Sequence, residues 1–253
     1  MNHILTLRCR SQQLVQDDWG GFSVNAWKVR TRTRKVPADR AAILICDMWD
    51  QHWSRAAAAR VEQMAPRMNA VVRSARNKGV SIIHAPSDTI TFYAETPARR
   101  RMLAVPGIEP PPAAEHTDPP KPVDDKDNSS DSNHGDEDSN NWCWTRQHAA
   151  IEIDQDRDVI SADGREVYSF LKARGIQAYL IMGVHTGMCI LHRTFGIKQM
   201  VRWGVQTLLV RDLTDAMYDP ACSPYVSHDE GTELLVRFIE KFWCPTIASA
   251  DLA

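Results

Sequence analysis

The sequence predicts an α/β protein: a three-layer α/β/α domain with a mainly parallel six-stranded sheet. Short apolar runs recur along the chain from Ala41 onward, and stretches with a helical apolar period separate most of them. Strands that alternate with helices pair in parallel and are covered by helices on both faces. The composition, 43% hydrophobic and 25% charged over 253 residues, is that of one sizeable globular domain.

Residues 1–40 are predicted to be an N-terminal extension with short edge strands. Apolar residues are spaced along two stretches of it: Leu5, Leu7, Val24, Trp27 and Val29. The basic run at 30–35 is interpreted as a solvated strand face rather than a nucleic-acid site.

Residues 41–253 are predicted to form the main domain. The expected strands are 42–46, 80–84, 149–153, 178–182, 205–210 and 246–248. An apolar stripe from Met64 to Ala75 predicts the first long helix, with Pro66 in its first turn and Gly79 after its end. Apolar positions from Ile190 to Met200 predict another helix, which begins at Cys189.

An acidic insertion, 107–142, interrupts this pattern. It opens with a proline-rich stretch and continues with acids and almost no apolar residues. Such a segment cannot bury enough surface to fold alone, so we expect either disorder or a lid over the site.

Charge and cysteine usage exclude several classes of function. The net charge of −2 gives no electrostatic reason to bind nucleic acid or an anionic membrane. No apolar run approaches a membrane-spanning length, and the N-terminus lacks the apolar core of a signal peptide. The six cysteines are scattered with no CxxC pair, which is typical of reduced thiols in a cytoplasmic protein.

Cys189 is the strongest candidate for a reactive residue. It follows an apolar run and the turn from Gly183, and it begins a new helical pattern. A thiol in a first helical turn is close to the positive end of the helix dipole, which favours the thiolate. Asp47 ends the buried run 42–46, so it would lie at the same edge of the sheet as Cys189.

Together, the ILICD segment at 43–47 and the GVHTGMC turn at 183–189 resemble the isochorismatase-like cysteine hydrolases. The resemblance extends from about Ala41 to Pro245. It implies that Cys189 is the nucleophile and Asp47 the acid/base. It also implies a cis peptide between Val184 and His185, with the backbone N–H groups of His185 and Cys189 as oxyanion donors.

The lysine of the family's catalytic group has no counterpart in the expected stretch 144–151. Arg146 is the nearest cation and is predicted either to replace the lysine or to be a surface residue. Arginine does not release a proton, so it is not an equivalent replacement.

Aromatic and polar residues near the expected strand ends predict the substrate pocket: Trp49, Trp53, His84 and Trp144. Nicotinamidases of this family bind a metal, and Asp50, His52 and His84 are the candidate ligands for a divalent metal here. The alternative, which we favour, is that these three are polar pocket walls and that no cofactor is required.

The resemblance implies a hydrolase that acts on a small amide-like or carbamoyl-like substrate, at C–N bonds other than peptide bonds. A non-catalytic binding protein with the same fold and isochorismatase-type ether hydrolysis are the alternatives. We expect a homo-oligomer with a small-molecule substrate and no nucleic-acid or membrane partner.

Overall fold

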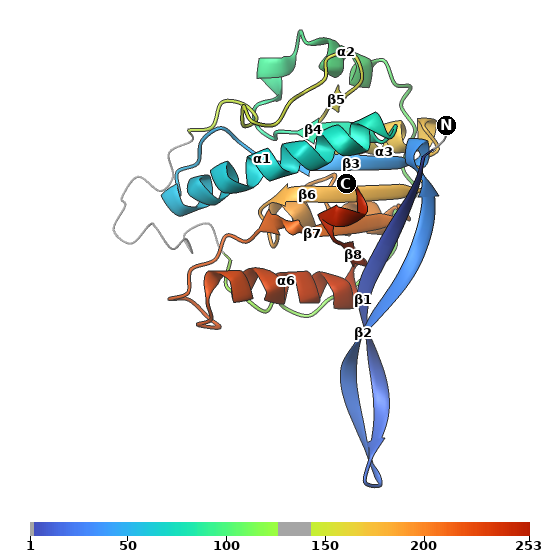
Figure 1. Ribbon diagram of the computed structural model, residues 1–253, viewed down its shortest axis with the longest axis vertical. Helices are drawn as coiled ribbons and strands as arrows, with labels where there is room; N and C mark the ends of the chain where they lie inside the picture. The colour runs from blue at the N-terminus through green and yellow to red at the C-terminus, as the bar shows by residue number, and fades with distance from the viewer. Residues whose placement is uncertain (1–2, 126–142) are drawn as a thin grey trace.

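The computed structural model, which describes residues 3–125 and 143–253, has a central sheet flanked by helices (Figure 1). The sheet has eight strands rather than six, in the order β2-β1-β8-β7-β6-β3-β4-β5. Its strands are β1 (Ile4–Trp19), β2 (Phe22–Pro37), β3 (Ala41–Cys46), β4 (Ser81–Ala85), β5 (Val159–Ile160), β6 (Ala178–Val184), β7 (Thr207–Asp215) and β8 (Thr246–Ile247). Strands β3 to β8 pair in parallel, and β1 joins β8 antiparallel at Arg10 and Thr246.

Helices cover both faces of the parallel strands, which confirms the predicted three layers. Alternate side chains of β3 point to opposite faces. Ile43 and Ile45 pack with α1 (Arg55–Asn77), whereas Leu44 packs on the other face. The helices that cover that face are α3 (Gly164–Ala173), α4 (Cys189–His192), α5 (Ile197–Arg202) and α6 (His228–Phe242). A short helix, α2 (Pro97–Leu103), lies near β5.

Three predictions of secondary structure are wrong. Residues 149–151 form a turn and a bend, 152–153 have no regular structure, and the edge strand is instead β5. Pro66 lies in the interior of α1, not in its first turn, because the helix begins eleven residues earlier, after the N-cap Ser54. The single helix expected after Cys189 is divided into α4 and α5, because the backbone of Arg193 is extended, with ψ of 157°.

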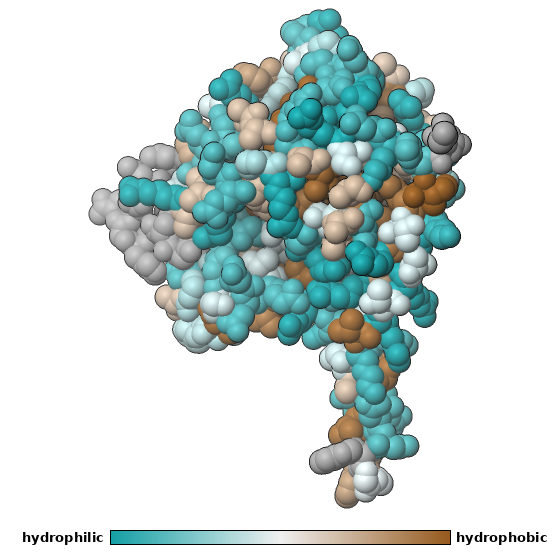
Figure 2. Space-filling model, in the orientation of Figure 1, coloured by the Kyte–Doolittle hydropathy of each residue, from teal (hydrophilic) through white to brown (hydrophobic). Residues whose placement is uncertain are grey.

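The N-terminal extension is a long hairpin that projects from the body as an arm (Figure 1). Its strands, β1 and β2, have 16 residues each and pair from Ile4 with Pro37 to Trp19 with Phe22. Gly20 and Gly21 form the turn with φ of 57° and 88°, values that suit a two-residue hairpin loop. The extension thus forms two strands that are much longer than expected, and of these two only β2 lies at the edge of the sheet. Figure 2 shows apolar side chains on the arm among hydrophilic ones.

The described part of the insertion, residues 107–125, is an extended segment on the surface, which we call the strap. Ala114 donates to the carbonyl of Arg202 at 2.9 Å, and Asp118 accepts from the Trp243 indole at 3.0 Å. The strap is thus held against α5 and the end of α6. The question of a lid or disorder over 126–142 lies outside the described residues.

In the part of the chain that the structure describes, no helix is both long enough and apolar enough to cross a membrane.

Candidate active site

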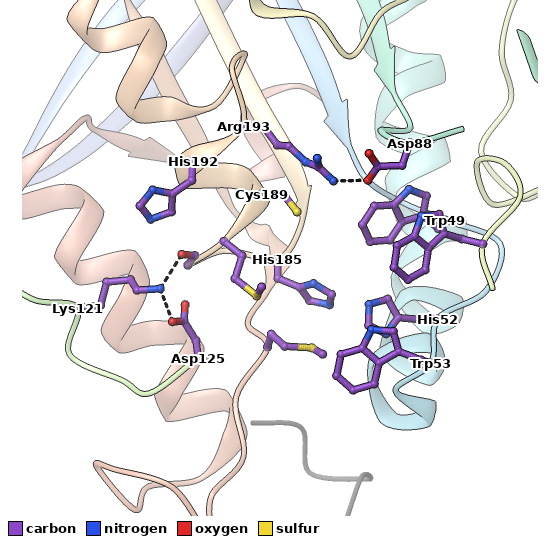
Figure 3. Close-up of a pocket in the computed structure, with 14 residues that line it drawn as sticks. Trp49, His52, Trp53, Asp88, Lys121, Asp125, His185, Cys189, His192 and Arg193 are labelled. Atoms are coloured by element: carbon purple, nitrogen blue, oxygen red, sulfur yellow. Dashed lines mark hydrogen bonds and ion pairs between the residues drawn. The ribbon is translucent and has the colours of Figure 1, made fainter. Parts of the chain in front are cut away.

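A cavity of about 730 Å³ opens at the carboxyl ends of β3 and β6 (Figure 3). One side is aromatic and comes mainly from the chain after β3. The other side comes from the turn after β6, the start of α4 and the strap. The lining residues are Trp49, His52, Trp53, Asp88, Lys121, Asp125, Trp144, His185, Gly187, Met188, Cys189, His192, Arg193 and Met217.

Asp47 lies beneath this cavity, directly after β3, and is fully buried. Its backbone has a φ of 47°, a left-handed conformation that is uncommon for a non-glycine residue and is concentrated at functional sites. The Ser87 N–H donates to its Oδ1 at 2.8 Å. Burial raises the pKa of the Asp47 carboxyl, and the charge of Arg193 opposes this rise.

Cys189 is the first residue of α4 and lines the cavity, and its thiol is close enough to Asp47 for the two groups to interact electrostatically. Burial and the charge of Asp47 raise the pKa of this thiol well above its usual value. The predicted thiolate at a helix start is therefore wrong for the resting site. A helix of four residues has too few aligned peptide dipoles to offset the loss of water around the sulfur.

Arg193 supplies a cation at this site. Its Nε donates to Asp47 Oδ2 at 3.2 Å and its Nη2 to Asp88 Oδ2 at 2.7 Å. These two acids and the Cys189 charge raise the pKa of Arg193 against the effect of its partial burial, so it stays protonated. Arg193 was not predicted as a site residue, because one continuous helix was expected here and the apolar spacing does not reveal the break at this residue.

Arg146 does not take the position expected for it. Its side chain is 54% exposed, lies 3.8 Å from Asp50 and packs over the Phe92 ring at 5.6 Å. It is absent from the cavity wall and has no contact with Asp47 among the interactions of the described residues. Of the two roles considered, the geometry supports the surface residue.

The turn between β6 and α4 has the predicted cis peptide between Val184 and His185. The carbonyl of His185 accepts from the N–H groups of Met188 at 3.0 Å and Ile190 at 3.2 Å, which closes the turn around Cys189. A hydrogen bond from the His185 backbone to the sulfur lowers the thiol pKa, though less than burial and Asp47 raise it. The oxyanion role of the His185 and Cys189 N–H groups stays a prediction.

The aromatic wall contains the predicted residues Trp49, Trp53 and Trp144, together with His52. The rings of Trp49 and Trp144 stack at 4.5 Å with an interplanar angle of 15°, and His52 stacks on Trp144 at 5.3 Å. Burial lowers the pKa of His52 to about 3, so this imidazole is neutral. The wall therefore presents flat, uncharged surfaces to a ligand.

His84 is not part of the pocket, contrary to the prediction. It is fully buried inside the sheet region, where Nδ1 lies 2.9 Å from Gln147 Oε1 and Nε2 lies 3.0 Å from Asp158 Oδ2. Asp50 accepts hydrogen bonds from the Thr145 side chain and N–H. The candidate metal ligands are not brought together, and residues 3–125 and 143–253 contain no group of three His, Cys, Asp or Glu that could hold a metal.

Lys121, Asp125 and Asp88 reach the cavity but were not predicted as site residues. Asp88 follows β4, where a strand end could have indicated it. Lys121 and Asp125 belong to the strap. The local sequence of an insertion does not indicate which part of the domain it will contact.

Comparison with known proteins agrees with the fold. The family model described as the Isochorismatase domain matches residues 41–222. Since this is more than half of the chain, the protein belongs to the isochorismatase family. It is a member of a hydrolase family with an α/β fold, as the resemblance predicted.

Two solved structures are similar in fold. A cysteine hydrolase from Pseudomonas syringae pv. phaseolicola has a TM-score of 0.51 and 16% identity. An isochorismatase from Pseudomonas putida has a TM-score of 0.50 and 10% identity. Each likeness covers 85% of this chain and 91% of the other. No protein with a curated description is significantly similar to this chain.

Proposed function

We propose that the protein is a cysteine hydrolase that cleaves a C–N bond in a small amide-like or carbamoyl-like substrate. The observation that carries this proposal is the electrostatic coupling of the Cys189 thiol to the buried carboxylate of Asp47, which accepts a hydrogen bond from Arg193 beside the cavity. A nucleophile, a proton acceptor and a fixed cation within contact of one another are what acyl transfer to sulfur requires.

In the first step, Cys189 must lose its thiol proton as it attacks the substrate. Because the thiol pKa is raised, the sulfur attacks as its proton moves to Asp47, and a C–S bond forms at the substrate carbonyl. The N–H groups of His185 and Cys189 would then stabilise the oxyanion. Asp47 returns the proton to the leaving nitrogen, the C–N bond breaks, and a thioester remains.

Water completes the cycle in the second step. Asp47, again a carboxylate, takes a proton from the water that attacks the thioester, and the acid product leaves as the proton returns to the sulfur. Arg193 does not transfer a proton, because a guanidinium does not ionise in this range. Its role is to favour the charged form of Asp47, whose pKa burial would otherwise raise further.

The chemistry can be tested without knowledge of the natural substrate. p-Nitrophenyl acetate should give a burst of nitrophenolate, and mass spectrometry should find one acetyl group on Cys189. Cys189→Ala should abolish both. Acyl transfer then justifies a screen of primary amides and N-carbamoyl compounds.

The alternatives give a different result. A non-catalytic binding protein and an ether hydrolase that forms no thioester would show no burst and no acetylated Cys189. That outcome, with a folded protein, would refute the proposed nucleophile.

A further inference from the structure

Two charged side chains enter the cavity from the strap and are not used by the steps above. Lys121 Nζ donates to the Gly187 carbonyl at 3.0 Å and pairs with Asp125 Oδ1 (Figure 3). Both residues line the cavity opposite the aromatic wall. The strap therefore brings an ion pair onto the turn that precedes the proposed nucleophile.

The second oxygen of Asp125 has no hydrogen-bond partner among residues 3–125 and 143–253. The residue is 3% exposed, yet its Oδ2 accepts no hydrogen bond from any residue in the described part of the chain. Burial raises the pKa of Asp125, while the hydrogen bond and charge of Lys121 oppose the rise. A buried carboxylate oxygen without a donor among the described residues has lost its hydration without replacement there, and a donor from a bound ligand would restore a hydrogen bond.

Gly187 makes room for this oxygen. A Cβ at residue 187 would lie 1.7 Å from Asp125 Oδ2, closer than any atoms can approach without a bond. The carboxylate therefore occupies the space that a side chain would fill, two residues before Cys189. Asp125 therefore packs on the turn that carries the nucleophile, and both residues line the same cavity.

We infer that Asp125 is a specificity-determining residue that binds a positively charged N–H donor, such as an ammonium or amidinium group, on the substrate. This inference rests on the proposed function and names the substrate class: a small amide or carbamoyl compound with a cationic amine at the end away from the reacting carbonyl. Arrival of such a group would complete the pairing of Asp125 with charge-assisted hydrogen bonds.

The remainder of the cavity suits this class. Trp49, Trp53 and Trp144 contribute aromatic rings to the cavity lining, and aromatic rings attract cations. The nearby imidazoles of His52 and His185 are neutral, because burial lowers their pKa values to about 3 and about 4, so they do not repel a cation.

The alternative is an anionic substrate that is bound by Lys121. The exposed fractions of the Lys121 and Asp125 side chains argue against it. The Lys121 side chain is 28% exposed, so water can satisfy its third N–H, whereas the Asp125 side chain is only 3% exposed. The unsatisfied group is the acceptor, and a ligand carboxylate would be repelled by it.

The test compares labelling of Cys189 by methanethiosulfonate reagents of different charge. The sulfur of Cys189 attacks the sulfenyl sulfur, a new S–S bond forms, and methanesulfinate leaves with the electron pair of the broken bond. Ammonium-bearing, neutral and sulfonate-bearing reagents are used with two spacer lengths. Each rate is divided by the rate with glutathione to remove intrinsic reactivity.

We expect the ammonium reagent to label Cys189 at least about tenfold faster than the sulfonate reagent. Asp125→Asn should reduce this preference for the ammonium reagent over the sulfonate reagent about tenfold. Asp124→Asn removes the same charge one residue away and is the matched control, with the preference retained. Gly187→Ala should displace the carboxylate and reduce the preference without a change of charge. Equal or anion-favouring rates in the wild type, or no change in Asp125→Asn, would overturn the inference.

A binding measurement separates this inference from the proposed function. Benzylammonium and benzoate are titrated against the tryptophan fluorescence of the Cys189→Ala protein, which needs no nucleophile. Benzylammonium should bind more tightly than benzoate, and this difference should disappear when Asp125→Asn is added to the Cys189→Ala protein. That result supports the cation site even if the protein shows no acyl transfer. Tighter binding of benzoate overturns it.

Discussion

Asp47 and Asp158 are two buried carboxylates at the ends of strands in the same sheet, and their surroundings differ. Asp158, directly before β5, accepts from Arg76 Nε at 2.9 Å and Nη2 at 2.5 Å, and lies 3.0 Å from His84. The Asp154 N–H adds a further hydrogen bond at 2.8 Å. Asp47, directly after β3, accepts from Ser87 and Arg193, and its other neighbour is the exchangeable proton of Cys189.

The pKa values of the two groups shift in opposite directions. Burial alone would raise the pKa of Asp158, but hydrogen bonds from His84 and Arg76 outweigh it and lower the pKa. At Asp47 burial prevails over Arg193 and the Ser87 hydrogen bonds, and the pKa is raised. A buried carboxylate whose oxygens all accept hydrogen bonds from protein groups contributes to stability. A buried carboxylate beside a cavity, with fewer such hydrogen bonds, can exchange a proton with a ligand.

The largest effect should come from Asp47→Asn. We expect acetylation of Cys189 by p-nitrophenyl acetate to fall about 10²–10⁴-fold, because the amide cannot accept the thiol proton. The thiol pKa should fall at the same time, since the charge of Asp47 helps to raise it. The rate of iodoacetamide labelling against pH measures the thiol pKa, and thermal unfolding checks the fold. Full acetylation activity in this variant would refute the acid/base role.

Asp158→Asn is the matched substitution at the carboxylate that is fully paired inside the protein. It should lower the free energy of unfolding rather than the acetylation rate. Removal of the charge leaves Arg76, whose side chain is 3% exposed, without its buried partner. Loss of about 3–5 kcal/mol in the free energy of unfolding is expected, measured by urea denaturation. The acetylation rate of the folded variant should be close to that of the wild type.

The same residue gives a pH dependence with a defined sign. The folded pKa of Asp158 lies below its unfolded value of about 3.9, so its contribution to stability is present above that value. The contribution is lost as the pH falls through the lower, folded pKa. Urea denaturation at acid pH should therefore show a steeper loss of stability in the wild type than in Asp158→Asn. Parallel curves would contradict the assignment.

A smaller effect is expected from Arg193→Gln. Arg193 lowers the pKa of both Cys189 and Asp47, so its loss should raise both. We expect about a tenfold slower acetylation of Cys189, because one charged hydrogen-bond partner of Asp47 is removed. An upward shift in the iodoacetamide pH profile would separate this electrostatic role from simple misfolding, which would show no defined shift.

Arg146→Ala should have the smallest effect. The exposed pair with Asp50 contributes about 0–1 kcal/mol to stability. The acetylation rate should stay within about twofold of the wild type, since the mutated side chain is outside the cavity. A loss as large as that of Arg193→Gln would show that Arg146, not Arg193, supplies the cation that replaces the family's lysine.

Strands and site residues that depend on the local sequence could be predicted. Residue positions that depend on contacts between segments far apart in the sequence could not. The apolar runs gave β3, β4, β6 and β7, and the strand end and turn indicated Asp47 and Cys189. Arg193 reaches Asp47 only because the chain leaves the helical conformation at that residue. His84 was misassigned because its place near a strand end does not reveal that Asp158 and Gln147 hold its ring in the interior.

The base of the hairpin arm is bonded to the main domain, whereas the side-chain bonds near its turn lie within the hairpin. At the base Leu7 is fully buried, and Arg10 and Gln12 both bond to Glu240 of α6. Near the turn the side-chain bonds join one strand to the other, as between Lys28 and Asp17 at 2.6 Å, and Phe22 is 76% exposed. Two strands alone are only marginally stable in water. Backbone amides at the base therefore exchange with solvent only when the whole domain unfolds, whereas those at the far end exchange through local opening that leaves the active site folded.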